Sequence, residues 1–154
     1  MGFDLLFHVE DGGSAVPDHQ EEALHDWIVT IILARGGKPG NINYILCGDE
    51  YLHRINVEYL AHDTYTDIIT FPDGHFPEVT GDLFISTERV AENANELNLP
   101  FREELHRVII HGILHLCGQG DKSEEEASEM RRLENWALGL RPEELTQGAD
   151  AGAK

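Results

Sequence analysis

Residues 101–121 read FREELHRVIIHGILHLCGQGD, and this stretch decides the fold. Its apolar residues cover most of the circumference of a helix, and they are Leu105, Val108, Ile109, Ile110, Ile113, Leu114 and Leu116. A helix that is apolar nearly all round is buried. We therefore expect residues 101–117 to form a central helix that the rest of the chain covers.

The segments on either side of this helix alternate between strand and helix patterns. Runs of β-branched and aromatic residues predict strands at 3–9, 41–48, 66–71 and 81–87. Apolar residues at three- and four-residue spacing predict further helices at 18–35, 49–60, 88–97 and 123–139. Residues 72–80 are expected to form a long loop between two paired strands. This order predicts an α+β fold, in which a four-stranded mixed sheet packs against about five helices.

Length and composition favour one soluble domain. The chain of 154 residues suits a single domain over residues 1–145, followed by a disordered tail at 146–154 that has no apolar anchor. No run of about 18 apolar residues exists, and the first residues are acidic where a signal peptide would be basic, so we expect a cytoplasmic protein. Cys47 and Cys117 give no disulfide framework and suit buried thiols.

The charge balance is strongly acidic, with 11 lysines and arginines against 29 aspartates and glutamates and a formal net charge of −18. Such a field repels nucleic acid at long range and argues against a protein that simply coats DNA or RNA. We expect neither DNA nor a membrane as a partner. A local basic patch near the central helix remains compatible with this balance, from Arg102, Arg107, Lys122, Arg131 and Arg132.

The end of the central helix carries a metal-binding pattern. His111 and His115 are four residues apart, so both imidazoles project from one helix face with Cβ atoms roughly 5–6 Å apart. Gly118 permits a left-handed turn that reverses the chain, and Asp121 can then return its carboxylate to the same ion. Catalytic zinc takes three protein ligands and keeps one position open. The spacing predicts that His111, His115 and Asp121 bind one divalent metal ion, with Zn²⁺ as the expected ion.

Such a centre indicates metal-assisted hydrolysis. In zinc peptidases of the H-E-x-x-H type, the general-base glutamate directly follows the first histidine. Here Gly112 follows His111, so a peptidase of that mechanism would lack its base.

Three ordered stretches of the sequence resemble one known family. HGILHLCGQGD (111–121) resembles the H-G-x-L-H-L-x-G-x-x-H signature of the YbeY family of metal-dependent endoribonucleases. YLAHDTYTDIITFP (59–72) is similar to the family segment Y-R-x-K-D-x-P-T-D-V-L-S-F-P, and GDLFISTERVAENA (81–94) is similar to G-D-I-x-I-S-x-E-x-x-x-x-Q-A. The resemblance covers about residues 40–140. It implies a single-strand-specific endoribonuclease that matures the 3′ end of small-subunit ribosomal RNA, with the small ribosomal subunit as partner.

The sequence departs from the family pattern at three positions. Asp121 stands where the third histidine is usual, so the site has one unit less positive charge and the ion should acidify its water less. Leu60 replaces an arginine, whose role toward RNA phosphate therefore cannot be carried over; His62 or Arg54 are candidates to compensate. Tyr65 replaces a proline.

The middle motif supplies the candidate catalytic residues. Thr66, Asp67 and Thr70 are expected to position water or the substrate backbone, although strand capping and sheet pairing are alternative roles. Two other functions remain open. One is a metallopeptidase or other small metallohydrolase. The other is a non-catalytic ribosome-assembly factor with a structural metal, which a fourth ligand such as Cys117 or His75 would support.

Overall fold

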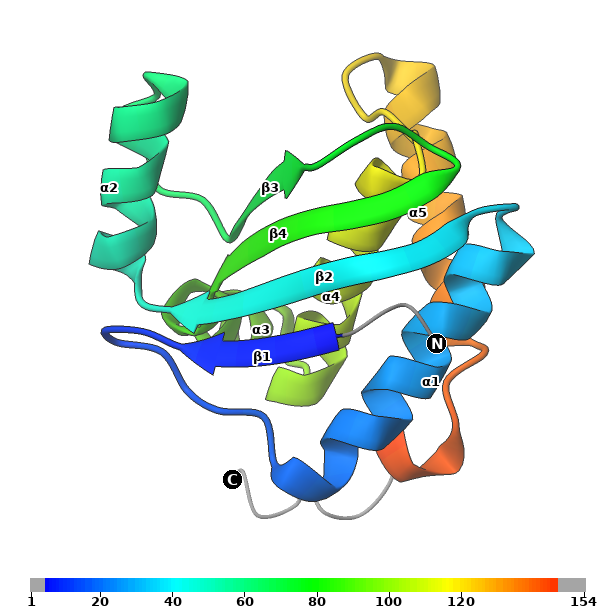
Figure 1. Cartoon of the computed structure of the whole chain (residues 1–154). Coiled ribbons are helices and arrows are strands. Elements are labelled where there is room, and N and C mark those ends of the chain that lie inside the picture. The colour runs from blue at the N-terminus through cyan, green and yellow to red at the C-terminus, as the bar shows by residue number, and fades with distance from the viewer. Residues whose placement is uncertain (1–4, 147–154) are drawn as a thin grey trace.

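A four-stranded sheet lies at the centre of the molecule (Figure 1). The computed structural model describes residues 5–146, and the rest of the chain lies outside the described part. The predicted tail at 146–154 therefore falls almost wholly outside it. The strands lie in the order β1-β2-β4-β3 and comprise Leu5–Val9, Lys38–Cys47, Glu78–Ser86 and Ile68–Pro72, respectively. β2 pairs in parallel with β1 and β4, and β3 pairs antiparallel with β4, which confirms the predicted mixed sheet.

Side chains alternate between the two faces of this sheet, and helices cover each face. α1 (Asp18–Ala34), α3 (Thr87–Leu97), α4 (Phe101–Leu116) and α5 (Glu124–Leu138) contribute to the larger core on one face. α2 (Asp49–Leu60) packs on the other face, where Leu52 contacts a small cluster with Cys47 and Ile69. A short 3₁₀ helix, Glu143–Leu145, follows α5. None of the helices in the described part is long and apolar enough to span a membrane.

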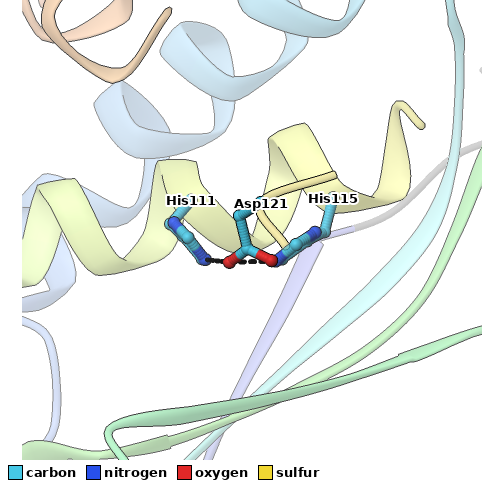
Figure 2. A group of neighbouring side chains, drawn as sticks. All are labelled: His111, His115 and Asp121. Atoms are coloured by element: carbon cyan, nitrogen blue, oxygen red, sulfur yellow. Dashed lines mark ion pairs between the residues drawn. The ribbon is translucent and has the colours of Figure 1, made fainter. Parts of the chain in front are cut away.

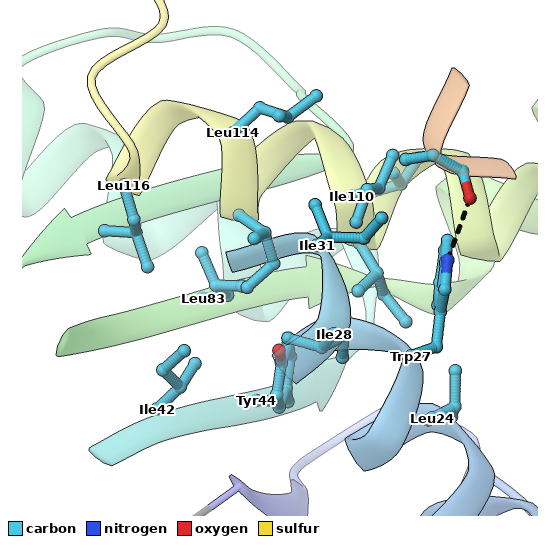
Figure 3. Close-up of a cluster of buried hydrophobic side chains, with 14 of the residues drawn as sticks. Leu24, Trp27, Ile28, Ile31, Ile42, Tyr44, Leu83, Ile110, Leu114 and Leu116 are labelled. Carbon is cyan, nitrogen blue, oxygen red and sulfur yellow. Dashed lines mark hydrogen bonds between the residues drawn. The ribbon is translucent and has the colours of Figure 1, made fainter. Parts of the chain in front are cut away.

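The larger core joins the sheet to the predicted central helix (Figure 3). Tyr44 of β2 and Leu83 of β4 are fully buried against Ile28 of α1 and Ile110 of α4. Trp27 is also buried, and its indole N–H donates to the carbonyl oxygen of Ala137 over 2.8 Å. This bond ties α1 to α5, and both helices contact α4. Most of the residues of α4 are buried, as the apolar circumference of residues 101–117 predicts.

The connection between β3 and β4 is shorter than the sequence predicts. The sequence predicts that residues 78–80 belong to a loop, but β4 begins at Glu78, where Glu78 and Val79 pair with Lys38 and Pro39 of β2. Val79 is fully buried and belongs to the core. The sequence does not predict this, because the turn-forming residues before it favour a loop.

α4 lies against the sheet at its glycine. A Cβ atom at Gly112 would lie 2.8 Å from Cδ1 of Ile68 and 2.9 Å from Cδ2 of Leu83. The absence of a side chain there lets the helix approach β3 and β4 closely. This close approach sets His111, the next residue along the helix, beside the start of β3.

Candidate metal centre

Two histidines of α4 and one aspartate from the loop after it point toward a common position (Figure 2). The Nε2 atoms of His111 and His115 each lie 3.3 Å from Oδ2 of Asp121. The three donor atoms lie within 4.8 Å of one another, and no fourth histidine, cysteine, aspartate or glutamate joins this group among residues 5–146. The fold thus brings together the three residues predicted as ligands.

The other nitrogen of each ring is held by a hydrogen-bond acceptor. Nδ1 of His111 donates to Oε2 of Glu134 over 2.7 Å, and Nδ1 of His115 donates to the carbonyl oxygen of Gln119 over 2.9 Å. We assign the ring protons from these partners. Each ring therefore carries its proton on Nδ1 and turns the lone pair of Nε2 toward Asp121.

This donor set fits a divalent cation. Two nitrogen lone pairs and a carboxylate oxygen that converge repel one another unless a positive charge lies between them. Ligand atoms about 2.0–2.1 Å from a tetrahedral ion are separated by about 3.3–3.4 Å. The observed nitrogen–oxygen distances of 3.3 Å match this spacing.

Glu134 of α5 connects the centre to the last helix. Glu134 is only 4% exposed, and its Oε1 accepts a hydrogen bond from Nη1 of Arg107 over 2.8 Å. Burial works to raise the pKa of Glu134, but the hydrogen bonds from His111 and Arg107 outweigh it and lower this pKa below its usual value. Burial likewise works to lower the pKa of His111, but the hydrogen bond to Glu134 and the surrounding carboxylates raise it overall.

The turn after α4 sets the position of Asp121. Gly118 has a φ of +91°, and the amide of Gln119 donates to the carbonyl oxygen of Leu114 over 3.0 Å. This is the glycine-based helix end that the sequence predicts. On the other side of Asp121, Ser123 caps α5 in a capping box with Glu126. The aspartate therefore lies in a short loop between two fixed helix ends.

A hollow of about 680 Å³ opens beside the three donors. It runs along the α2–β3 connection and the start of β3, and it is bordered by His111, His115, Asp121, Lys122, Leu60, His62, Thr64 and the three candidate catalytic residues Thr66, Asp67 and Thr70. Burial raises the pKa of Asp67, although the charge of His111 opposes that rise. The structure thus places the middle motif next to the metal centre.

The family model described as Endoribonuclease YbeY matches residues 10–139. The chain belongs to the endoribonuclease YbeY family. This finding confirms the resemblance that the three sequence motifs indicate.

Several proteins named Endoribonuclease YbeY are similar to this chain. Those from Flavobacterium johnsoniae and Christiangramia forsetii are 53% and 52% identical, with 78% and 79% of this chain and 86% and 85% of theirs covered. One from Parabacteroides distasonis is 44% identical over 91% of this chain and 97% of its own. The solution structure of TM1509 from Thermotoga maritima has a TM-score of 0.61 and 26% sequence identity, and the match covers 96% of this chain and 97% of that one.

Of the three positions that depart from the YbeY pattern, Leu60 and Asp121 border the hollow and Tyr65 does not. Leu60 borders the hollow and is 40% exposed, and His62 borders it as well. Arg54, the other candidate to compensate for the absent arginine, is not among the lining residues, and its guanidinium lies over the ring of Tyr51. Tyr65 instead turns to α2, where its hydroxyl donates to Oε2 of Glu50 over 2.8 Å.

The predicted basic patch is largely neutralised by acidic neighbours. Arg107 pairs with Glu134, and Arg132 pairs with Glu129. Lys122 borders the hollow and has an exposed side chain. It is therefore the cation of this set that is placed to contact a substrate in the hollow.

The two alternative functions lose support within the YbeY fold. The peptidase glutamate has no space at Gly112, because that position faces Ile68 and Leu83 in the core. Cys117 is buried and His75 lies in the β3–β4 connection, and neither joins the donor group in the described part of the chain. A structural zinc site with four protein ligands is thus not formed by these residues.

Sequence reasoning missed Glu134, although a signal for it exists. Met130, Leu133 and Ala137 form the buried stripe of α5, and Glu134 falls on that stripe by its spacing. A glutamate on an apolar stripe requires a partner. Because that partner is His111, 23 residues earlier, only the folded chain reveals it.

Proposed function

We propose that this chain is a metal-dependent endoribonuclease that cuts single-stranded RNA at the centre formed by His111, His115 and Asp121. Membership of the endoribonuclease YbeY family supports the reaction, and the three converging donors support the site. The observation that carries the proposal is the pair of 3.3 Å distances from the two Nε2 atoms to one carboxylate oxygen. We propose Zn²⁺ as the ion, because two imidazoles and a carboxylate in a tetrahedral spacing suit it.

A divalent ion held there would polarise a phosphoryl oxygen and acidify a bound water molecule. The protein's own residues orient the centre and the substrate. Glu134 and the Gln119 carbonyl hold the imidazoles with their Nε2 atoms inward. Asp67 and Thr66 border the hollow beside His111, where we propose that their oxygens position the attacking water.

The hollow suits a single strand of RNA. Lys122 supplies a positive charge for a phosphate, while Thr64 and His62 supply hydrogen-bonding groups along the α2–β3 connection. We further propose that the substrate is the 3′ region of small-subunit ribosomal RNA and that the small ribosomal subunit is the partner. A cytoplasmic location stays a prediction that follows from this substrate.

The proposal is tested by RNA cleavage with the metal-loaded protein. We expect it to cut a 5′-labelled single-stranded RNA internally, to lose this activity on chelation, and to regain it when Zn²⁺ is returned. The variant Asp121→Ala should lose at least about 100-fold in kcat/KM, because the ion loses one of its three ligands. The variant His75→Ala, in the β3–β4 connection, serves as the matched control and should keep full activity. Cleavage that persists without metal, or cleavage of peptides in place of RNA, would contradict the proposal.

A further inference from the structure

A second cavity adjoins the metal centre. It has a volume of about 320 Å³ and lies between the start of β3, α4 and α5. It shares His111, Asp121, Asp67 and Ile68 with the larger hollow as lining residues. A strand of RNA whose phosphate lies at the metal centre would therefore meet two depressions, one of them between β3, α4 and α5.

A buried carboxyl group without a partner lines this cavity. Glu104 of α4 is only 7% exposed, and its Oε1 is buried with no hydrogen-bond partner in the described part of the chain. An unpaired buried polar atom carries a free-energy cost, because it has lost its hydrogen bonds to water and gained none. Burial, followed by the charge of Asp67, raises the pKa of Glu104. A ligand that donates hydrogen bonds to this carboxyl group would remove the cost.

The charges of the cavity favour a neutral ligand. Its lining combines four carboxyl groups with two guanidinium groups and apolar side chains, namely Asp67, Glu104, Asp121 and Glu134, then Arg107 and Arg131, and, as apolar walls, Ile68, Val108 and Met130. The carboxyl groups disfavour an anion, and the arginines disfavour a cation. Apolar walls with a few convergent polar groups are typical of a pocket for a planar organic group.

We propose that this cavity holds the base of a nucleotide next to the scissile phosphate, and that Glu104 selects guanine. This inference rests on the proposed endoribonuclease function. Ile68, Val108 and Met130 line the cavity with apolar side chains, which would contact the faces of a flat base. The Watson–Crick edge of guanine presents N1–H and N2–H side by side, and these two donors match the two oxygens of one carboxylate. Adenine and cytosine place a single amino group beside an acceptor, which a carboxylate would repel.

The test uses single-stranded oligouridylates that carry one guanosine, adenosine, cytidine or inosine at a central position. We expect the metal-loaded protein to cut next to guanosine about tenfold faster than next to uridine. Inosine lacks the N2 amino group and should lose most of that preference. In Glu104→Gln the guanosine-to-uridine ratio should fall at least fivefold, while the metal content stays at the wild-type value. Glu96→Gln on the exposed face of α3 is the control and should leave the ratio unchanged.

Binding of guanosine monophosphate provides a second measurement that needs no cleavage. Metal-loaded protein should bind guanosine monophosphate about tenfold more tightly than uridine monophosphate, and Glu104→Gln should remove this difference. Equal rates at all bases and equal binding of the two nucleotides would overturn the proposal, and so would a preference for another base. Absence of RNA cleavage by metal-loaded protein contradicts the proposed function, whereas the binding measurement still decides the role of the cavity.

Discussion

The ionised carboxylate of Glu134 orients a ring that the ion would bind. It accepts hydrogen bonds from His111 and from Arg107, and each of its oxygens serves one partner. A carboxylate behind a ligating imidazole fixes the tautomer and increases the basicity of the ring. Asp121 itself brings a negative charge to the centre, so the family's third imidazole is replaced by a stronger electrostatic partner for the ion.

Replacing Glu134 by glutamine should weaken metal binding about 10- to 100-fold. The amide keeps a similar shape but loses the charge that strengthens the hydrogen bond from His111. A competition titration with a zinc chelator measures this change, and Glu125→Gln on the exposed part of α5 is the control. Equal affinity in Glu134→Gln and the wild type would show that the carboxylate does not support the centre.

His106 is a second histidine of α4, and it belongs to the core. The residue is 1% exposed, its Nδ1 accepts a hydrogen bond from Nη1 of Arg141 over 2.9 Å, and its ring lies against Trp27. Burial, followed by the charge of Arg141, lowers the pKa of His106 to about 4. The folded protein therefore keeps this ring neutral over a pH range in which the unfolded chain protonates it.

The pKa of His106 predicts a loss of stability in mild acid. The folded pKa of about 4 lies below the unfolded value of 6.5. The folded state therefore keeps its full stability above pH 6.5 and loses stability as the pH falls toward 4, because the unfolded chain then gains a proton on this ring. At pH 5 the loss due to this group should be about 2 kcal/mol relative to pH 7. Urea denaturation of wild type and His106→Gln at both pH values tests this. An equal decline in the two proteins would contradict the assignment.

At the scale of elements, the end of α4 and the start of α5 together build the centre. The left-handed glycine after α4 reverses the chain, and the capping box of α5 holds the far side of the loop. A Cβ atom at Gly118 would meet nothing within 4 Å, so only its backbone conformation requires glycine. Gly36 follows α1 with a φ of +84° and the same free space, but it is not part of the turn that leads to Asp121.

These two glycines give a matched pair of variants. Gly118→Ala and Gly36→Ala should each lower the free energy of unfolding by about 1 kcal/mol, because both place an alanine in the left-handed region. Only Gly118→Ala should also weaken zinc binding, since it shifts the loop that carries Asp121. Thermal denaturation and a zinc titration of both variants separate the effects. Equal zinc affinity in the two would mean that the turn does not position the aspartate.

The sequence predicts elements whose pattern is local and misses features that depend on distant partners. The apolar circumference of residues 101–117 predicts the buried helix, and the spacing of His111, His115 and Asp121 predicts their convergence. Strand ends are less predictable, because residues 78–80 join β4 only through pairing with β2. The sequence does not predict the cavity at Glu104, because its walls come from β3, α4 and α5, which are brought together only by folding.

At the scale of the whole molecule, a strongly acidic chain belongs to a family of enzymes that act on RNA. The formal net charge of −18 opposes the approach of RNA, while Lys122 and Arg131 lie at the hollow and the cavity beside the centre. Repulsion between distant charges is screened by salt over about 10 Å at 0.1 M. Substrate capture should therefore depend on a few close contacts and not on long-range attraction.

This charge distribution predicts an unusual salt dependence. For a basic RNA-binding protein, affinity falls steeply with monovalent salt because cations are released from the RNA. Here KM for a short single-stranded RNA should fall, or change by less than about twofold, between 20 and 150 mM KCl, because screening removes net repulsion. Steady-state kinetics at fixed zinc concentration test this. A KM that rises about tenfold over that range would contradict this prediction, because it would show that a basic surface dominates RNA binding.

The proposed activity depends most directly on one ion bound by His111, His115 and Asp121. Elemental analysis of the purified protein after loading with Zn²⁺ and removal of excess measures this. We predict about one equivalent per chain in the wild type and in His75→Ala, and less than about 0.2 equivalents in His115→Ala, because two remaining ligands hold zinc weakly. A full equivalent of zinc in a folded His115→Ala protein would contradict the metal centre.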